Sequence, residues 1–434
     1  MQKTKQTQTG GVRFTREMKK DYTILIPTML PMHFSLIARI LQAYGYRCEL
    51  LRNEGKGVVD CGLQYVHNDT CYPALLVIGQ FLDALQSGRY DTHRVALMLS
   101  QTGGGCRASN YISLLRKALE KAGYGYVPVI SFNVAGLDDS PGFKLTVPML
   151  HRMLYAVMYG DLLMLLRNQC RPYEVNAGES EALAEKWTAR LTDEMAQKRI
   201  RYRQVKRNYQ AIIRDFAAIE RQGKPKIRVG IVGEIFVKFS PLGNNGLEDF
   251  LVSQGAETVL PGLLDFCLYS VYNGIADYEL YGRGPVRSKI NGIAYRFLLK
   301  KQRDVIDAVK TEGTFRPATP FEKTRSLIEG IIGIGAKMGE GWLLPAEMME
   351  LMEDGVNNIV CAQPFGCLPN HIMGKGVMKP LKEAHPDVNI VAIDYDPGAS
   401  RINQENRIKL MLANAARAAS EKAPQGEEKI HVMA

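Results

Sequence analysis

Cysteines that follow predicted strands and turns are the residues of this chain best suited to chemistry. In QTGGGCRASNY, residues 101–111, three glycines precede Cys106 and a helical segment follows it. Cys71 lies in NDTCYP, ahead of the apolar segment ALLVIGQFLDAL, and Cys367 lies in PFGCLPNH. Each of the three follows a turn and precedes a predicted helix. The chain has eight cysteines in all: Cys48, Cys61, Cys71, Cys106, Cys170, Cys267, Cys361 and Cys367.

Thiols in this setting are predicted to be ligands. A helix N-terminus carries a partial positive charge, which favours thiolate over thiol. Gly104 and Gly105 let backbone amides approach a bulky or anionic group, so they are predicted to line a cofactor site. A single cysteine would be interpreted as a packed core residue, but three in the same setting favour ligation. Because no two cysteines have CxxC spacing, distant segments must assemble any metal site.

The elements that position these thiols alternate between strand and helix. Apolar, β-branched runs predict strands at residues 23–30, 95–102, 127–132, 227–234, 358–365 and 389–396. Segments with helical periodicity adjoin them, such as NYISLLRKALEKAG after Cys106. Strands so continuously apolar are buried on both faces, which predicts parallel sheets covered by helices. Ligands of such α/β sheets bind at the carboxyl ends of the strands, where Cys106 and Cys367 are expected.

The same patterns predict two α/β domains of flavodoxin-like architecture joined by long helices. The expected divisions are a disordered basic tail at 1–20, a first α/β domain at 21–165, a helical connector at 166–225, a second α/β domain at 226–420 and a loose tail at 421–434. The second domain carries a predicted helical insertion at about 273–339.

Composition places the chain among soluble globular proteins. The N-terminus is polar and basic without the apolar region of a secretory signal, and no apolar run approaches the roughly 18 residues of a membrane span, so we expect a cytoplasmic protein. The net charge of +10 is diffuse. The basic cluster at 198–207 is expected either to be a solvated helix face or to dock an acidic partner. Aromatic residues are not interleaved with basic ones as in nucleic-acid modules, and no nucleic-acid or membrane partner is expected.

Several motifs resemble the 2-hydroxyacyl-CoA dehydratase superfamily, specifically the C-terminal part of the large acyl-CoA dehydratase activase proteins, which are related to double-cubane cluster proteins. The motifs are YVHNDTCYPALLVIGQ, DTHRVALMLSQTGGGCRASNYI, VGIVGEIFVKFSPLGNNGLEDFL, ADYELYGRGPV, QPFGCLPNHIMGKG and AIDYDPGASRINQENRIKLML, spread over residues 22–415. The resemblance implies an anaerobic iron-sulfur protein with two flavodoxin-like domains, which receives electrons from a separate ATP-hydrolysing activator.

The resemblance also implies ligands. Cys71, Cys106 and Cys367 match three cysteines that hold one 4Fe-4S cluster in dehydratase subunits. Double-cubane relatives need about six thiolates. Cys61 and Cys361 are the next candidates for metal ligands, although Cys361 stands in a strand and could face the core instead. Even with these two, a double cubane would still need Cys170 or a cysteine from a partner, so the type of cluster stays open. Cys48 and Cys267 are expected to be structural.

The predicted function is that of an ATP-coupled iron-sulfur reductase or dehydratase-like subunit acting on a small molecule, with a 2-hydroxyacyl-CoA as one candidate. The alternative is a non-catalytic electron relay or scaffold subunit. The chain has no GxxxxGK[ST] motif, and the glycines of GIGAKMGEGW at 333–342 follow a helical pattern. ATP is therefore expected on the activator. A second dehydratase-like subunit or a homodimer is the other expected partner.

Polar residues near these thiols have two possible roles, and no catalytic residue is assigned. Glu234 at a strand end, and Ser109 and Asn110 after Cys106, could orient a substrate or could be helix caps and interdomain contacts. His371 could donate a proton or could simply begin a helix.

Overall fold

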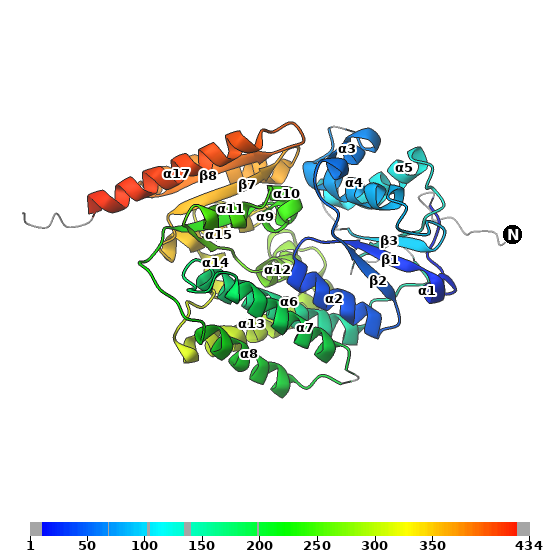
Figure 1. The fold of residues 1–434 in the computed structure, drawn as a ribbon, viewed down its shortest axis with the longest axis horizontal. Coiled ribbons are helices and arrows are strands. Elements are labelled where there is room, and N and C mark those ends of the chain that lie inside the picture. Colours follow the sequence, from blue (N-terminus) through cyan, green and yellow to red (C-terminus); the bar gives the residue numbers. More distant parts are fainter. Residues whose placement is uncertain (1–10, 68, 102–104, 134–139, 198, 423–434) are drawn as a thin grey trace, which may run out of the picture.

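The computed structural model describes residues 11–67, 69–101, 105–133, 140–197 and 199–422. It contains two four-stranded, entirely parallel sheets surrounded by helices (Figure 1), which confirms the predicted α/β class with two flavodoxin-like sheets. The strands of the first sheet are β1 (Thr23–Pro27), β2 (Arg47–Leu51), β3 (Val95–Ser100) and β4 (Val129–Phe132), and those of the second are β5 (Arg228–Gly233), β6 (Glu257–Val259), β7 (Asn358–Pro364) and β8 (Asn389–Tyr395).

Both sheets have the same topology. The first has the order β2-β1-β3-β4 and the second the order β6-β5-β7-β8, so in each the second strand lies at one edge and the third pairs with the first. The strand order reverses between β1 and β3 and again between β5 and β7. Parallel sheets bind ligands in the crevice above such a switch point. Cys106 follows β3 and Cys367 follows β7, so each comes after one of the two strands that define a switch point.

Helices cover both faces of the first sheet. In Figure 1, α3, α4 and α5 lie above it, and α2 lies below it. Helix α4 is buried on nearly all sides, because it packs against the sheet, α3 and α5. These elements are α1 (Met18–Asp21), α2 (Pro31–Ala43), α3 (Lys56–Tyr65), α4 (Tyr72–Gln86), the 3₁₀ helix η1 (Arg107–Asn110) and α5 (Tyr111–Lys121).

A bundle of three helices follows the first sheet; it begins with α6 inside the predicted first domain and continues through the predicted connector at 166–225. Helix α6 packs against α2 on one side and against β6 and α12 on the other, so it joins the two α/β units. Among the described helices it alone is long and apolar enough to cross a membrane, and 67% of its apolar window is buried, as expected of a core helix in a soluble protein. The bundle helices are α6 (Val147–Cys170), α7 (Glu179–Met195) and α8 (Tyr202–Ala217).

The second unit contains the predicted helical insertion as a hairpin of two long helices, α12 and α13. Trp342 anchors the hairpin, because it is fully buried and packs edge-on against Tyr269 and Tyr272. The helices of this unit are α9 (Ile235–Phe239), α10 (Pro241–Asn244), α11 (Leu247–Ser253), α12 (Leu263–Tyr281), α13 (Pro285–Glu312), α14 (Phe321–Ser326), α15 (Leu343–Glu353), the π-helix η2 (Asn370–Lys375), α16 (Met378–Ala384) and α17 (Arg401–Lys422).

The prediction of a disordered tail at 1–20 is wrong for its described part. Residues 11–20 lie against the first unit, Phe14 is fully buried, and its carbonyl accepts a hydrogen bond from Gly142 N. Phe14 fixes this segment to the first unit, and the sequence around it has no periodic apolar pattern that would have predicted its burial. Residues 1–10 and most of the predicted loose tail at 421–434 lie outside the described residues, whereas Glu421 and Lys422 end α17.

Close packing of α3 against α4 generates the first prediction. A side-chain carbon at Gly79 would lie 2.1 Å from the carbonyl oxygen of Val58 in α3. We expect Gly79→Ala to lower the free energy of unfolding by about 1–3 kcal/mol in urea titrations, because the helices must separate. Gly292→Ala in α13 is the matched control, since the nearest atom there is 3.9 Å away. Alanine should raise stability at that site by up to about 1 kcal/mol. Equal effects at both positions would contradict the packing argument.

Candidate metal centre

Cys71 and Cys367 lie next to each other although they belong to different α/β units. A side-chain carbon at Gly366 would lie 3.2 Å from Cys71 Cα. The amide of Tyr72 donates a hydrogen bond to the carbonyl of Phe365 at 3.0 Å. The loop after β7 and the turn before α4 are therefore joined by main-chain contact at the carboxyl end of the second sheet.

Cys106 approaches this pair from the other strand end. Cys106 lies close enough to raise the pKa of Cys71 and that of Tyr111. The Tyr111 hydroxyl lies 3.2 Å from Cys71 Sγ. A side-chain carbon at Gly339 would lie 4.0 Å from Cys106 Cβ and 3.2 Å from Pro369. The loop around Gly339 thus bridges the Cys106 and Cys367 segments. The structure brings together three cysteines that lie far apart in the sequence.

Each of the three cysteines lies at or just before the beginning of a helix. Cys71 is the N-cap of α4, while Cys106 caps η1 and its sulfur accepts a hydrogen bond from Ala108 N at 3.3 Å. Cys367 lies three residues before Asn370, the first residue of η2. Amide donors of this kind lower the pKa of a thiol and orient its sulfur.

Two buried carboxyl groups lie near the thiols. Glu234, at the end of β5, accepts from Val237 N at 2.9 Å, and Glu340 accepts from Ile235 N at 3.0 Å. Both interact electrostatically with Cys367. Burial, together with the neighbouring Glu340, raises the pKa of Glu234 to about 8, and burial also raises the pKa of Glu340. Sequence reasoning selected Glu234 but missed Glu340 and Tyr111, which a loop and a helix bring to the site.

Lys238, whose charge lowers the pKa of Glu340, is already paired with Glu347 at 2.8 Å, and both side chains are buried. Burial raises the pKa of Cys71 to about 11 and that of Cys367 further still, although the backbone amides of Ala74 and Asn370 act in the opposite direction. Without a cation these two thiols therefore stay protonated at pH 7, whereas iron would stabilise the thiolates and release their protons.

Among the described residues, no group of three or more His, Cys, Asp or Glu side chains is arranged to hold a metal ion. In a cluster each thiolate binds a different iron, so the sulfurs need not share one centre. Gln363, near the end of β7, is fully buried, and both atoms of its amide lack a partner among the described residues. An unpaired amide at a switch point fits a bound group there.

Cys61 does not join the three thiols. It lies on α3, and its thiol donates to Gln86 Oε1 at 3.4 Å. Gln86 is the last residue of α4, whereas Cys71 precedes the first, and a 15-residue helix is about 22 Å long. Antiparallel packing of α3 on α4 places Cys61 toward the far end of α4. Proximity in sequence to Cys71 suggested a ligand, but the helical hairpin separates the two.

Cys361 lies beneath η2, the helix that follows Cys367. It is fully buried in the core of the second unit, and its thiol faces Asn370 Oδ1 at 3.7 Å. Burial raises its pKa to about 12. Of the two orientations that the strand pattern allowed, the structure has the one that faces the core. Cys170 is likewise buried, against the carbonyl of Phe216 at 3.7 Å.

Neighbouring polar residues serve local structure. Ser109 Oγ donates to the carbonyl of Cys106 at 2.8 Å, Asn110 precedes α5, and His371 Nδ1 lies 2.9 Å from the carbonyl of Cys367. Gly105 N donates to Met338 Sδ at 3.1 Å, which ties the glycine loop to the second unit. Gly104 lies outside the described residues.

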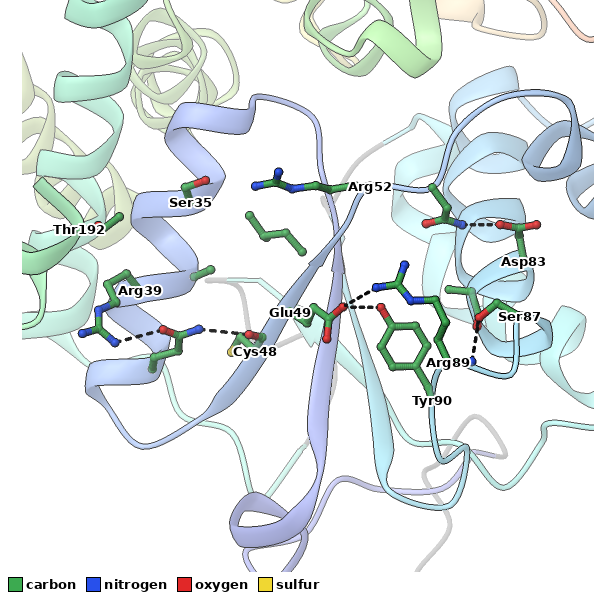
Figure 2. A pocket seen from close by; sticks show the side chains of 15 residues that line it. Ser35, Arg39, Cys48, Glu49, Arg52, Asp83, Ser87, Arg89, Tyr90 and Thr192 are labelled. Carbon is green, nitrogen blue, oxygen red and sulfur yellow. Dashed lines mark hydrogen bonds and ion pairs between the residues drawn. The ribbon is translucent and has the colours of Figure 1, made fainter. Parts of the chain in front are cut away.

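A pocket elsewhere on the surface does not adjoin the thiols. Figure 2 shows it along the edge strand β2, between α2 and the end of α4. Its charged groups largely satisfy one another: Tyr90 donates to Glu49 at 2.6 Å, Arg89 lies 3.7 Å from the same carboxylate, and Asn53 donates to Asp83 at 2.7 Å. We interpret it as a groove that protects the sheet edge.

The buried carboxyl groups predict how stability depends on pH. Burial and neighbouring carboxylates raise the pKa of Glu234 and of Glu350 to about 8, from about 4.3 in the unfolded chain. The folded state therefore binds more protons between these values, so stability is greatest below about pH 4.3 and falls as pH rises toward 8. Urea titrations of the metal-free protein should show this fall for the wild type. In Glu234→Gln the fall should be smaller, and an unchanged pH profile would contradict the assignment.

Compared with known proteins, the chain matches no protein-family model and has no significant match among curated proteins.

Proposed function

We propose that this chain is an iron-sulfur protein in which Cys71, Cys106 and Cys367 hold the cluster between the two α/β units. The observation that carries the proposal is the convergence of three thiols, one from each of three remote segments, beside two buried carboxyl groups. Such a set of acidic donors needs a cation to be stable as anions. Three thiols, with Cys61 on α3 and Cys361 in the core of the second unit, favour one 4Fe-4S cluster over a double cubane on this chain.

In this proposal the cluster supplies one-electron chemistry at low potential, and the residues of the chain control its surroundings. The amide of Ala108 donates a hydrogen bond to the Cys106 sulfur, and the backbone amides of Ala74 and Asn370 lower the pKa of Cys71 and of Cys367. The Tyr111 hydroxyl lies 3.2 Å from Cys71 Sγ and limits how that sulfur turns.

Glu234 is the group we assign to proton handling. With its pKa raised to about 8, its carboxyl is protonated at pH 7. A neutral acid can donate a proton beside the site without adding negative charge before the reduction. It would thus compensate the charge of an electron that arrives at the cluster or at a bound substrate. Glu340 accepts a backbone hydrogen bond and positions the loop at Gly339.

We further propose that the electrons come from a separate ATP-hydrolysing activator, since the chain has no P-loop motif and its motifs resemble proteins served by such an activator. The proposed substrate is a small molecule, with a 2-hydroxyacyl-CoA as the candidate, and the proposed setting is the cytoplasm of an anaerobe. A second dehydratase-like subunit or a second copy of the chain would complete the enzyme.

Iron content tests the ligand assignment. Protein reconstituted anaerobically with iron and sulfide should contain about four irons per chain. Cys71→Ala, Cys106→Ala and Cys367→Ala should each lose most of this iron and the charge-transfer absorption of the cluster. Cys61→Ala is the matched control, because its thiol donates to Gln86 at the last residue of α4, and it should keep the wild-type iron. Wild-type iron in all three site variants would refute the assignment, and about eight irons per chain would favour the double cubane.

Turnover tests the assignment as an enzyme. Reconstituted protein should convert 2-hydroxyacyl-CoA thioesters only when an activator of this superfamily, ATP and a low-potential donor are all present. Glu234→Gln should retain the iron but lower the turnover number by about 10²-fold or more, as expected for loss of a proton donor. Cluster reduction without any product from a panel of thioesters would instead support an electron relay.

A further inference from the structure

Helix α13 exposes a stripe of large apolar side chains. Val286, Ile290, Ile293 and Phe297 are 70%, 61%, 64% and 42% exposed. Their spacing of four, three and four residues is that of the a and d positions of a heptad repeat, which forms a narrow seam along one side of a helix. Single exposed apolar residues are ordinary on protein surfaces, but four in heptad register mark a contact surface.

The opposite side of α13 is already packed. Asn291 approaches Gly274 of α12 closely, Tyr295 packs against Tyr272 at 5.4 Å between ring centroids, and Gln302 donates to Asp265 at 2.7 Å. The helix also contacts α8 and α6, and Figure 1 shows it beside α8. These contacts fix α13 in place, and Phe297 at one end of the stripe adds a contact with His151 of α6, at 5.9 Å between ring centroids.

The charged residues that flank the stripe are all basic. Arg287, Lys289 and Arg296 are exposed at flanking positions and form no ion pair with the described residues. The sequence from 280 to 303 contains no Asp or Glu. In a heptad pair the residues flanking the seam choose the partner by charge.

We propose that the Val286–Phe297 face of α13 docks an α-helix of another protein, one with an apolar heptad seam flanked by acidic residues. Two copies of this face would bring basic residues against basic residues, which disfavours self-association. A membrane would instead require a broad apolar face, whereas this one is a narrow two-position seam. The inference does not depend on the proposed cluster, because it concerns a surface in another part of the second unit.

The docked helix would lie close to the loop that borders the thiols. Tyr281 ends α12, and a side-chain carbon at Gly335 would lie 2.8 Å from its hydroxyl. Three residues further along, Met338 accepts the hydrogen bond from Gly105 N. A partner on this face could thereby contact the loop at 335–340.

A peptide pair tests the proposal on the full chain. One helical peptide of about three heptads carries Ile and Leu at a and d with Glu at e and g, and its twin carries Lys at e and g; like charges keep each from pairing with itself. Binding measured by fluorescence anisotropy should favour the Glu peptide by about tenfold or more. Ile290→Glu and Ile293→Glu should each weaken the binding of the Glu peptide by about tenfold or more. Leu410→Glu is the control, because Leu410 in α17 is as exposed as Ile293. This variant should bind the Glu peptide as the wild type does.

Charge reversal distinguishes this charge-selective binding from non-specific hydrophobic binding. Combining Arg287→Glu, Lys289→Glu and Arg296→Glu should switch the preference from the Glu peptide to the Lys peptide. Equal binding of both peptides would overturn the proposal. So would dimers of the wild type that Ile290→Glu disrupts in analytical ultracentrifugation, or binding to phosphatidylserine vesicles without any binding to the Glu peptide.

Discussion

The central constraint in this structure is the burial of several acidic groups at one place. Three thiols and two carboxyl groups meet where the α/β units join, and the nearby lysine is already paired with Glu347. Taking charged groups out of water is costly unless an opposite charge accompanies them. Burial therefore favours the protonated forms of Cys71, Cys367 and Glu234, whereas a bound cation would favour the deprotonated forms. The tyrosine hydroxyl and the backbone amides suit both, since they can bond to a thiol or to a thiolate.

The repeated topology explains how distant residues reach one place. In both sheets the third strand pairs with the first, and a thiol follows that third strand. Helix α6 holds the two units together through its contacts with α2, β6 and α12. Each unit thus contributes a strand-end loop, and α4 adds a third thiol from its N-terminus. The contact between Tyr72 and Phe365 joins the units beside the thiols.

The sequence predicted the parts of this structure that depend on local pattern. Apolar runs located six of the eight strands, all but β2 and β6, and turn residues located the helix starts after Cys71, Cys106 and Cys367. The three-residue strand β6 is too short for periodicity, and it carries a buried Glu257 that pairs with Arg316.

Other features depend on tertiary contacts that no local pattern encodes. Cys61 is near Cys71 in sequence, yet the α3–α4 hairpin carries it toward the other end of α4. Glu340 reaches the site through a loop that is distant in sequence from Cys71 and Cys106. Phe14 lies in a basic segment that composition alone marks as a tail, and only packing against the first unit reveals it as a core residue.

The origin of the thiols in separate units has a consequence for assembly. Cys106 and Cys71 belong to one unit and Cys367 to the other, so no partly made chain that stops before the last two strands contains the full set. Any cofactor held by all three must enter after both sheets have formed and closed on each other. Insertion of such a cofactor would then require the completed fold. A molecule that retains the cofactor would be one in which both units have folded.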